Sequence, residues 1–475
     1  MLPWADAASM ALDAPVTEMP PTDATVEASA SAPTEKDVLS ALPSEEYGQY
    51  EEADMIDDLV VDETRDFILG DEDVPPDDDE SELGSEIGDA SEMEDDPLEA
   101  DPKLVLEPPA EDHSTHTLQA HSEPVYSIAI NCAHPEHVAT GGGDDVGYLW
   151  RLGTPAPPVK LEGHTDTISC MQFNADGTLL ATGGLEGAVR VWEAETAELV
   201  IALEGPSQGI NWLSWHVRGN VLLVGSEDAT AWMWKLPEGS VMQIFSAHSA
   251  SVSYGAFANN GKCIVTASED GTVRVWNPRA GTVDHTMQCG ANGAREEGLL
   301  ITCLAAHPTH PVVMFGMDDG KLKLGQLETG KVLAQLISHE ASIESAGFCA
   351  VMQLAASANM DGKLCIWDLN TFALRHVCTH GAGVIELRWL RDSPLLATCT
   401  VSRELRVYDA RDGGCLSRMI GHHDAVLCLE VGYTSQGNFL FSGSDDCTAR
   451  VWPLRTEQPA AAASSAVAVA RPSMP

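Results

Sequence analysis

The sequence lacks three features that would each indicate a particular class of protein. Its 12 cysteines form no CxxC pair and no Cys/His cluster at zinc-ligand spacing, so neither a zinc module nor a disulfide framework is indicated. No apolar run approaches the roughly 20 residues that a membrane-spanning helix needs. Basic residues are scarce, with 26 Lys and Arg against 73 Asp and Glu, which disfavours nucleic acids and anionic membranes as direct partners.

Signals for targeting and for small-molecule chemistry are missing as well. The first residues, 1–13, contain Asp6 and lack both a basic region and a sustained apolar core, so they are not a secretory signal. No phosphate loop, nucleotide fingerprint or metal constellation is present, and His134, His137, His307 and His310 are expected in solvated turns. We therefore expect no cofactor, no metal and no membrane insertion.

The acidic charge is distributed unevenly. Residues 1–112 hold 36 acidic and 3 basic side chains, a net charge of −33, whereas residues 113–475 carry −14. The first segment cannot bury enough apolar surface to offset its ordering entropy, so we predict a disordered leader over 1–112. A second disordered tail is predicted over 457–475, which is rich in Ala, Ser and Pro.

Between these segments, one unit recurs along the chain. In the stretch 266–276 an acid, Asp270, is followed six residues later by an aromatic, Trp276. Aromatic positions equivalent to Trp276, with Gly at one of them, follow one another at intervals of 42, 42, 42, 49, 42, 41 and 44 residues. A period of this size is typical of a four-stranded propeller blade. The spacing predicts an all-β, eight-bladed β-propeller over 113–456.

The two ends of this region complement each other. After Trp452 no fourth strand follows for the last blade, while a strand-like segment at about 114–120 has no blade before it. Because an unpaired sheet edge is a hazard in all-β folds, we expect the N-terminal strand to complete the last blade and close the ring.

Several repeats bring a histidine, a hydroxyl, an acid and a tryptophan together. This pattern resembles the WD-repeat family, whose blades hold such a set as a structural hydrogen-bond network. A hydrolytic triad is the alternative, but a ring of repeats supplies neither an open site nor an oxyanion hole. The predicted network residues are His164, Thr182, Glu186 and Trp192; His248, Thr266, Asp270 and Trp276; and His422, Ser442, Asp446 and Trp452. Where the set is incomplete, as at Gly325, Ser402 and Pro206, we expect different packing.

In the WD-repeat family, the entry to the innermost strand and the residue before the turn acid lie on one rim, which is the usual partner-binding face. Acids occupy these places in the present sequence: Glu123, Asp166, Glu227, Glu269, Asp318, Glu340, Glu344, Asp424 and Asp445. Convergent carboxylates would attract a peptide rich in Arg or Lys, although an acid before the turn Asp also simply solvates a loop. Three aromatic residues near this rim are candidate stacking anchors: Tyr126, Trp212 and Tyr254.

Three stretches, 143–151, 230–237 and 345–352, are similar to the angio-associated migratory cell protein family. The acidic leader followed by eight repeats also matches. Fungal relatives of that family are dedicated chaperones that hold the basic N-terminal segment of a large-subunit ribosomal protein on an acidic propeller face. Animal members are associated with cell migration and signalling.

Three hypotheses follow. The resemblance implies a monomeric, cytoplasmic escort for a basic ribosomal protein, with the nucleus as a second location. The alternative is a scaffold or signalling adaptor in which the acids only solvate the surface, and this predicts neutral partners and weak salt dependence. An enzyme is the third hypothesis, and the sequence offers no site for it.

Overall fold

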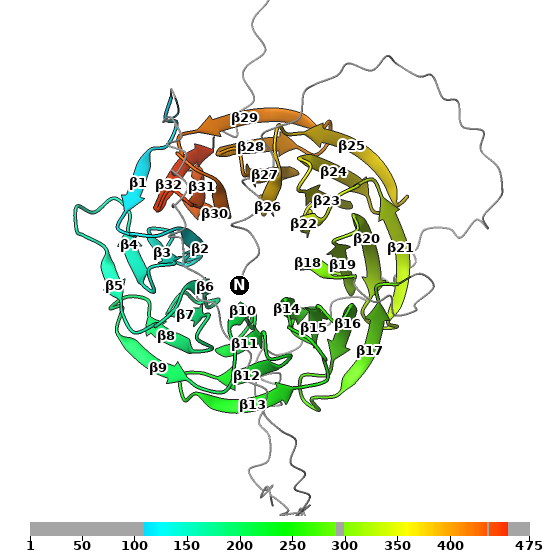
Figure 1. The fold of residues 1–475 in the computed structure, drawn as a ribbon, viewed down its shortest axis with the longest axis horizontal. Helices are drawn as coiled ribbons and strands as arrows, with labels where there is room; N and C mark the ends of the chain where they lie inside the picture. The colour runs from blue at the N-terminus through cyan, green and yellow to red at the C-terminus, as the bar shows by residue number, and fades with distance from the viewer. Residues whose placement is uncertain (1–108, 110, 291–298, 435–436, 455–475) are drawn as a thin grey trace, which may run out of the picture. The chain divides into compact units, whose positions relative to one another are not determined.

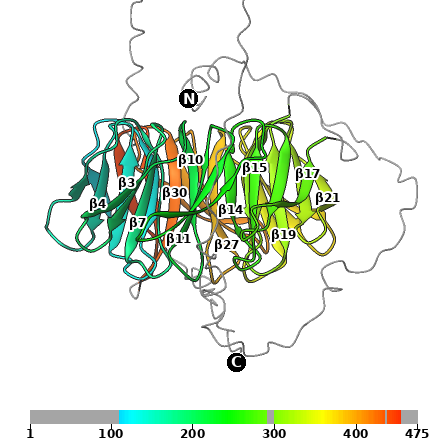
Figure 2. The ribbon, with the colours of Figure 1, turned by 90° about the horizontal axis from the view of Figure 1, so that it is seen from below.

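The computed structural model describes residues 109, 111–290, 299–434 and 437–454. The predicted leader lies almost entirely outside the described residues, as do the predicted C-terminal tail and part of the 49-residue interval. In the described part of the chain, 32 strands form eight four-stranded antiparallel sheets. Figure 1 shows these sheets arranged around a ring, with one strand of each sheet near the centre, and Figure 2 shows the same ring from the side. This is the eight-bladed β-propeller predicted from the repeat.

Each blade is numbered by its place along the chain and runs from an inner to an outer strand. Blades 1 to 4 comprise β2 (Val125–Ile130), β3 (His137–Gly142), β4 (Gly147–Arg151) and β5 (Val159–Leu161); β6 (Ile168–Phe173), β7 (Leu179–Gly184), β8 (Val189–Glu193) and β9 (Leu199–Leu203); β10 (Ile210–Trp215), β11 (Val221–Ser226), β12 (Ala231–Lys235) and β13 (Ser240–Phe245); and β14 (Tyr254–Ala258), β15 (Cys263–Ser268), β16 (Thr272–Trp276) and β17 (Val283–Gln288).

Blades 5 to 8 follow the same order. They comprise β18 (Ile301–Ala306), β19 (Val312–Met317), β20 (Lys321–Gln326) and β21 (Lys331–Ile337); β22 (Ile343–Phe348), β23 (Leu354–Asn359), β24 (Lys363–Asp368) and β25 (Ala373–Thr379); β26 (Val384–Trp389), β27 (Leu395–Thr400), β28 (Glu404–Asp409) and β29 (Gly414–Ile420); and β30 (Val426–Thr434), β31 (Gly437–Ser444), β32 (Thr448–Leu454) and β1 (His116–Gln119).

The ring closes in blade 8, where β1 pairs antiparallel with β32. His116 lies opposite Val451 in this pairing, and the backbone N–H of Thr115 donates to the Val451 carbonyl at 2.8 Å. Asp112 and Arg450 add an ion pair across the junction at 2.5 Å. The outermost strand of the last blade therefore comes from the start of the ring, which is the arrangement expected from the missing fourth strand.

The core lies between neighbouring blades. In one cluster Leu179, Ala181 and Val191 of blade 2 pack against Val224 and Trp234 of blade 3, and all five are buried. The second strands of the blades are covered on both faces and are buried along their length, as in β3, β7 and β19. The inner strands also carry half-buried residues, as in β6 and β14. Because each blade has the next one as its hydrophobic partner, a closed ring leaves no blade face uncovered. No helix in the described ranges has the length and hydropathy to cross a membrane.

Candidate binding face

The connections into the inner strands and the turns between the second and third strands lie at the same end of every blade. We call this end the rim face. A backbone hydrogen bond joins the two loops in each blade: the N–H of the residue before the turn acid, or before Ser402 in blade 7, donates to a carbonyl in the connection that leads into the inner strand. Examples are Glu227 to Gly209 at 2.9 Å and Glu269 to Ser251 at 3.0 Å. Two sequence segments about 18 residues apart thus form one surface.

Eight of the nine predicted rim acids lie in these loops. Glu123, Asp166, Glu269, Glu340 and Asp445 are exposed, and Glu227, Asp318 and Asp424 are half-buried. Some of them also bond their own loops, since Asp424 accepts from the Ala425 N–H at 2.8 Å and Asp318 from the Leu300 N–H at 3.2 Å.

The ninth acid, Glu344, departs from this arrangement. It is the second residue of β22, inside the inner strand, and is half-buried. Burial raises the pKa of its carboxyl group, against a hydrogen bond from Ser342 that lowers it. Glu344 therefore lies on the wall below the rim loops, because β22 already begins at Ile343.

The three aromatic candidates differ in position. Tyr126 is half-buried, and its pKa is raised by burial and by the neighbouring carboxylates of Asp445 and Glu123, so it lies among the rim acids. Tyr254 is half-buried at the start of β14, where burial raises the pKa of its hydroxyl. The prediction for Trp212 as a stacking anchor is wrong: its ring is buried between blades 3 and 4.

The reason for the burial of Trp212 is a pair of glycines. A side chain at Gly225 or Gly255 would clash with the indole, which fills the space beside both. The indole Nε1–H donates to the Val252 carbonyl at 2.9 Å. Trp212 is therefore part of the packing between two blades, and its ring faces are covered.

The predicted structural network is present in blade 4. His248 lies with Nδ1 3.0 Å from an Asp270 oxygen and Nε2 2.7 Å from the Thr266 hydroxyl, to which Trp276 Nε1–H donates at 2.7 Å. Burial raises the pKa of Asp270, but hydrogen bonds from His248 and Thr272 outweigh it and lower the pKa overall. Each buried polar group in this set therefore has a partner.

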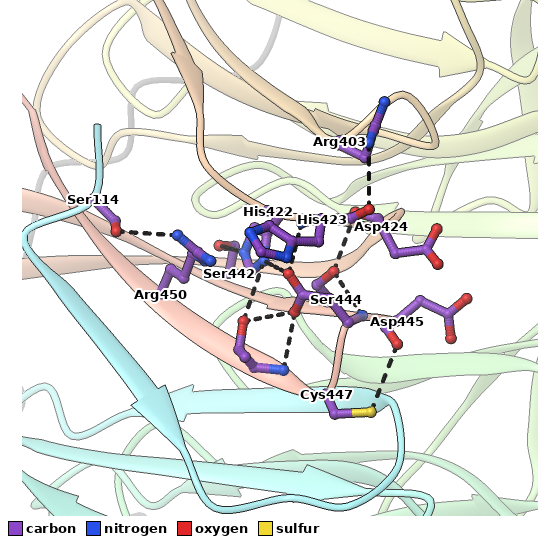
Figure 3. Close-up of polar contacts among 12 residues, drawn as sticks. Ser114, Arg403, His422, His423, Asp424, Ser442, Ser444, Asp445, Cys447 and Arg450 are labelled. Atoms are coloured by element: carbon purple, nitrogen blue, oxygen red, sulfur yellow. Dashed lines mark hydrogen bonds and ion pairs between the residues drawn. The ribbon is translucent and has the colours of Figure 1, made fainter. Parts of the chain in front are cut away.

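Blades 2 and 8 repeat the arrangement. His164 lies 2.6 Å from Glu186 and 2.8 Å from Thr182, and Trp192 donates to the same hydroxyl at 3.0 Å. In blade 8, Asp446 and Ser442 lie 3.0 and 2.7 Å from His422, and Trp452 donates to Ser442 at 2.8 Å. Figure 3 shows His422 and Ser442 in this blade, with Arg403 of blade 7 reaching the His423 carbonyl at the rim.

The incomplete repeats are packed differently. At Gly325 in blade 5 the side chain of Met287 fills the space that a side chain would take, and the buried Lys323 ammonium donates to the Cys289 and Gly290 carbonyls. In blade 7, Tyr408 replaces tryptophan, and its hydroxyl lies 3.2 Å from His380 Nε2.

The structure adds residues that the candidate set did not contain. Blade 1 has a full network, in which His121 lies 2.8 Å from Asp144 and 2.9 Å from Thr140. At the rim, burial and the nearby carboxylates of Asp166 and Glu186 raise the pKa of Asp145. The sequence signal for Asp145 is the acid directly after a turn acid, whereas the candidate set considered only the acid before it.

The network hydroxyls do not form a catalytic site. Thr266 and Ser442 are fully buried, and each is engaged with both a histidine and a tryptophan. A nucleophile needs access to substrate and a site for the developing oxyanion. Within the described ranges, no group of three or more His, Cys, Asp or Glu is arranged to hold a metal ion.

Comparison with known proteins agrees with this architecture. The WD domain, G-beta repeat family matches residues 112–151, 156–193, 197–235, 239–277, 330–368 and 413–453. A WD repeat-containing protein of Schizosaccharomyces pombe is 36% identical over 341 residues, which cover 70% of this chain and 85% of the relative. The human angio-associated migratory cell protein is 32% identical over 167 residues, or 32% of this chain and only 38% of the human protein.

Solved structures show the same fold. The crystal structure of Chaetomium thermophilum Sqt1 bound to the N-terminus of the ribosomal protein L10 matches 72% of this chain and 100% of that chain, with a TM-score of 0.67 and 24% identity. Saccharomyces cerevisiae Sqt1 matches 72% of this chain and 99% of that chain, with a TM-score of 0.67 and 21% identity.

Proposed function

Because the chain belongs to the WD-repeat family, we propose that it is a non-enzymatic binding propeller that escorts a newly made ribosomal protein of the large subunit. The rim face holds the basic segment of this client. The main support for this function is that eight carboxylates lie in the loops at one end of the ring. Convergent negative charge raises the local concentration of a cationic peptide and speeds its association.

Two further observations support the client class. Residues 113–475 carry a net charge of −14, and the leader carries −33, so a basic partner is favoured over an acidic one. One neighbour in fold, Sqt1, is described in complex with the N-terminus of the ribosomal protein L10. The proposal places the protein as a monomer in the cytoplasm, where ribosomal proteins are made, with the nucleus as the alternative.

The test is charge reversal on the rim face. We expect the triple variant Glu227→Lys, Glu269→Lys and Asp318→Lys to lose the client while the ring stays folded, because these side chains lie in surface loops. Each variant is tagged and purified from its own cytosol at low and at moderate salt, and the proteins that elute between the two are identified by mass spectrometry. The wild type should yield one stoichiometric, basic large-subunit ribosomal protein that is lost as salt rises.

A matched control changes the same charge at the opposite end of the ring. Glu198, Glu238 and Glu328 are exposed and lie in turns between the third and fourth strands. Their triple change to Lys should leave client binding intact. If the rim variant retains the client, the rim face is not the binding site. If the co-purifying proteins stay bound at moderate salt and include signalling proteins, the adaptor hypothesis is favoured instead.

A further inference from the structure

The contact between the turn acid and the buried histidine, which four other blades share, is missing in blade 6. In blades 1, 2, 4 and 8, the turn acid lies 2.6 to 3.0 Å from Nδ1 of its histidine. In blade 6, His339 still bonds Ser357 at 2.7 Å, and Trp367 donates to the same hydroxyl at 2.9 Å. However, His339 Nδ1 is buried and has no hydrogen-bond partner. The turn acid, Asp361, is exposed.

The residue two positions before the acid explains this difference. Blade 4 has Ser268 there, and its hydroxyl accepts the Asp270 N–H at 3.1 Å. Asp270 is then free to accept the N–H of Thr272 at 2.9 Å with one oxygen and to bond histidine with the other.

Blade 6 has Asn359 at the same position. Its Oδ1 accepts the Lys363 N–H at 2.8 Å and so takes over the turn bond that the acid makes elsewhere. The Asn359 Nδ2 group is buried without a partner. Asn359 thus replaces the acid in the turn, and the carboxylate of Asp361 is left in solvent.

The exposed carboxylate belongs to the rim face. The Met360 N–H donates to the Ser342 carbonyl at 3.2 Å, which places this turn as in the other blades. Glu340, whose side chain is 86% exposed, lies in the connection beside it, 3.8 Å from the Lys363 ammonium. Burial and Lys363 lower the pKa of His339 to about 4, so this histidine is neutral at physiological pH.

We propose that Asp361 is a client-binding residue of the rim face, released from its blade network by Asn359, and that it takes an Arg or Lys side chain of the client together with Glu340. The inference rests on the proposed function and adds a residue to it. Two unpartnered buried groups, on His339 and Asn359, are a cost that the Ser-containing blades avoid. The same arrangement leaves the carboxylate of Asp361 exposed on the rim face.

The decisive variant is Asn359→Ser in the full chain, which gives blade 6 the turn of blade 4. Asp361 should then move onto His339 Nδ1, and the melting temperature should rise by about 2 °C, as expected for one recovered hydrogen bond in a domain of this size. Binding of the rim face to a nona-arginine peptide should weaken about threefold. The double variant Asn359→Ser, Asp361→Asn should lose the gain in melting temperature.

Asp361→Asn alone should weaken peptide binding about threefold and leave the melting temperature unchanged, because this acid is outside the network. The peptide carries a benzophenone group, and cross-links to residues 339–363 are counted separately from those to the acidic leader. Unchanged cross-linking in both variants, or a lower melting temperature for Asn359→Ser, would overturn the inference.

Glu269→Lys, tested with the same peptide, separates this inference from the proposal that it rests on. If Glu269→Lys weakens binding and the blade 6 variants do not, only the role of Asp361 is lost. If Glu269→Lys has no effect either, the rim face itself is not a cation site.

Discussion

Replacing Thr266 by Val removes one buried hydroxyl from blade 4 while keeping the shape of the side chain. This hydroxyl accepts from the Trp276 Nε1–H and is bonded to His248 Nε2, both at 2.7 Å. The variant therefore leaves two buried polar groups without a partner, and each such group costs about 1 to 3 kcal/mol. Burying a methyl in place of the hydroxyl recovers up to about 1 kcal/mol. We expect the free energy of unfolding to fall by about 1 to 6 kcal/mol.

The measurement is urea unfolding followed by tryptophan fluorescence and by circular dichroism. The two probes must give the same transition with an unchanged m-value for the difference to be read as stability. Thr286→Val is the matched control, because Thr286 is exposed on β17 of the same blade, and it should change the stability by less than about 0.5 kcal/mol.

A double-variant cycle tests the mechanism. In a Trp276→Phe background the indole N–H is already gone, so Thr266→Val should cost less than in the wild type. Equal stabilities of Thr266→Val and Thr286→Val would refute the reasoning that the network satisfies buried polar groups. An equal cost of Thr266→Val in both backgrounds would show that Trp276 is not the partner that matters.

Two further predictions concern stability. Trp276→Ala should destabilise the ring by about 3 to 5 kcal/mol, because the indole is 2% exposed and leaves a large cavity; an unchanged melting curve would contradict its buried role. Burial is the main cause that lowers the pKa of His307, His339 and His380 to about 4 from 6.5. As the pH falls, the unfolded chain therefore takes up protons on these histidines before the folded chain does. The free energy of unfolding keeps its full value above pH 6.5 and decreases toward pH 4, by on the order of 1 to 2 kcal/mol per histidine at pH 5. Melting temperatures at pH 7, 6 and 5 check this, and a constant value would show that these histidines titrate normally.

The repeat itself was readable from the sequence because its determinants are local. The step from Asp270 to Trp276 spans one turn and one strand, and the network partners His248 and Thr266 lie in the same blade. Their spacing is therefore fixed by strand and turn lengths. The period gave the number of blades in the same way, since each blade of an antiparallel meander uses a nearly constant length of chain.

The features that the sequence did not reveal depend on contacts between blades or on competition within a turn. Trp212 was expected on the rim, but glycines of its own and the next blade leave space for its ring inside. Burial and the carboxylate of Asp166 in the following blade raise the pKa of Asp145. Asp361 has the same spacing to its tryptophan as Asp270, yet Asn359 takes its place in the turn. The sequence alone determined the ring and its eight blades, and the resemblance to WD repeats indicated the end at which the acids gather. Only the tertiary structure decided which side chains reach that surface, because burial depends on neighbours in the next blade, about 40 residues away along the chain, and on which side chain accepts the hydrogen bonds within a turn.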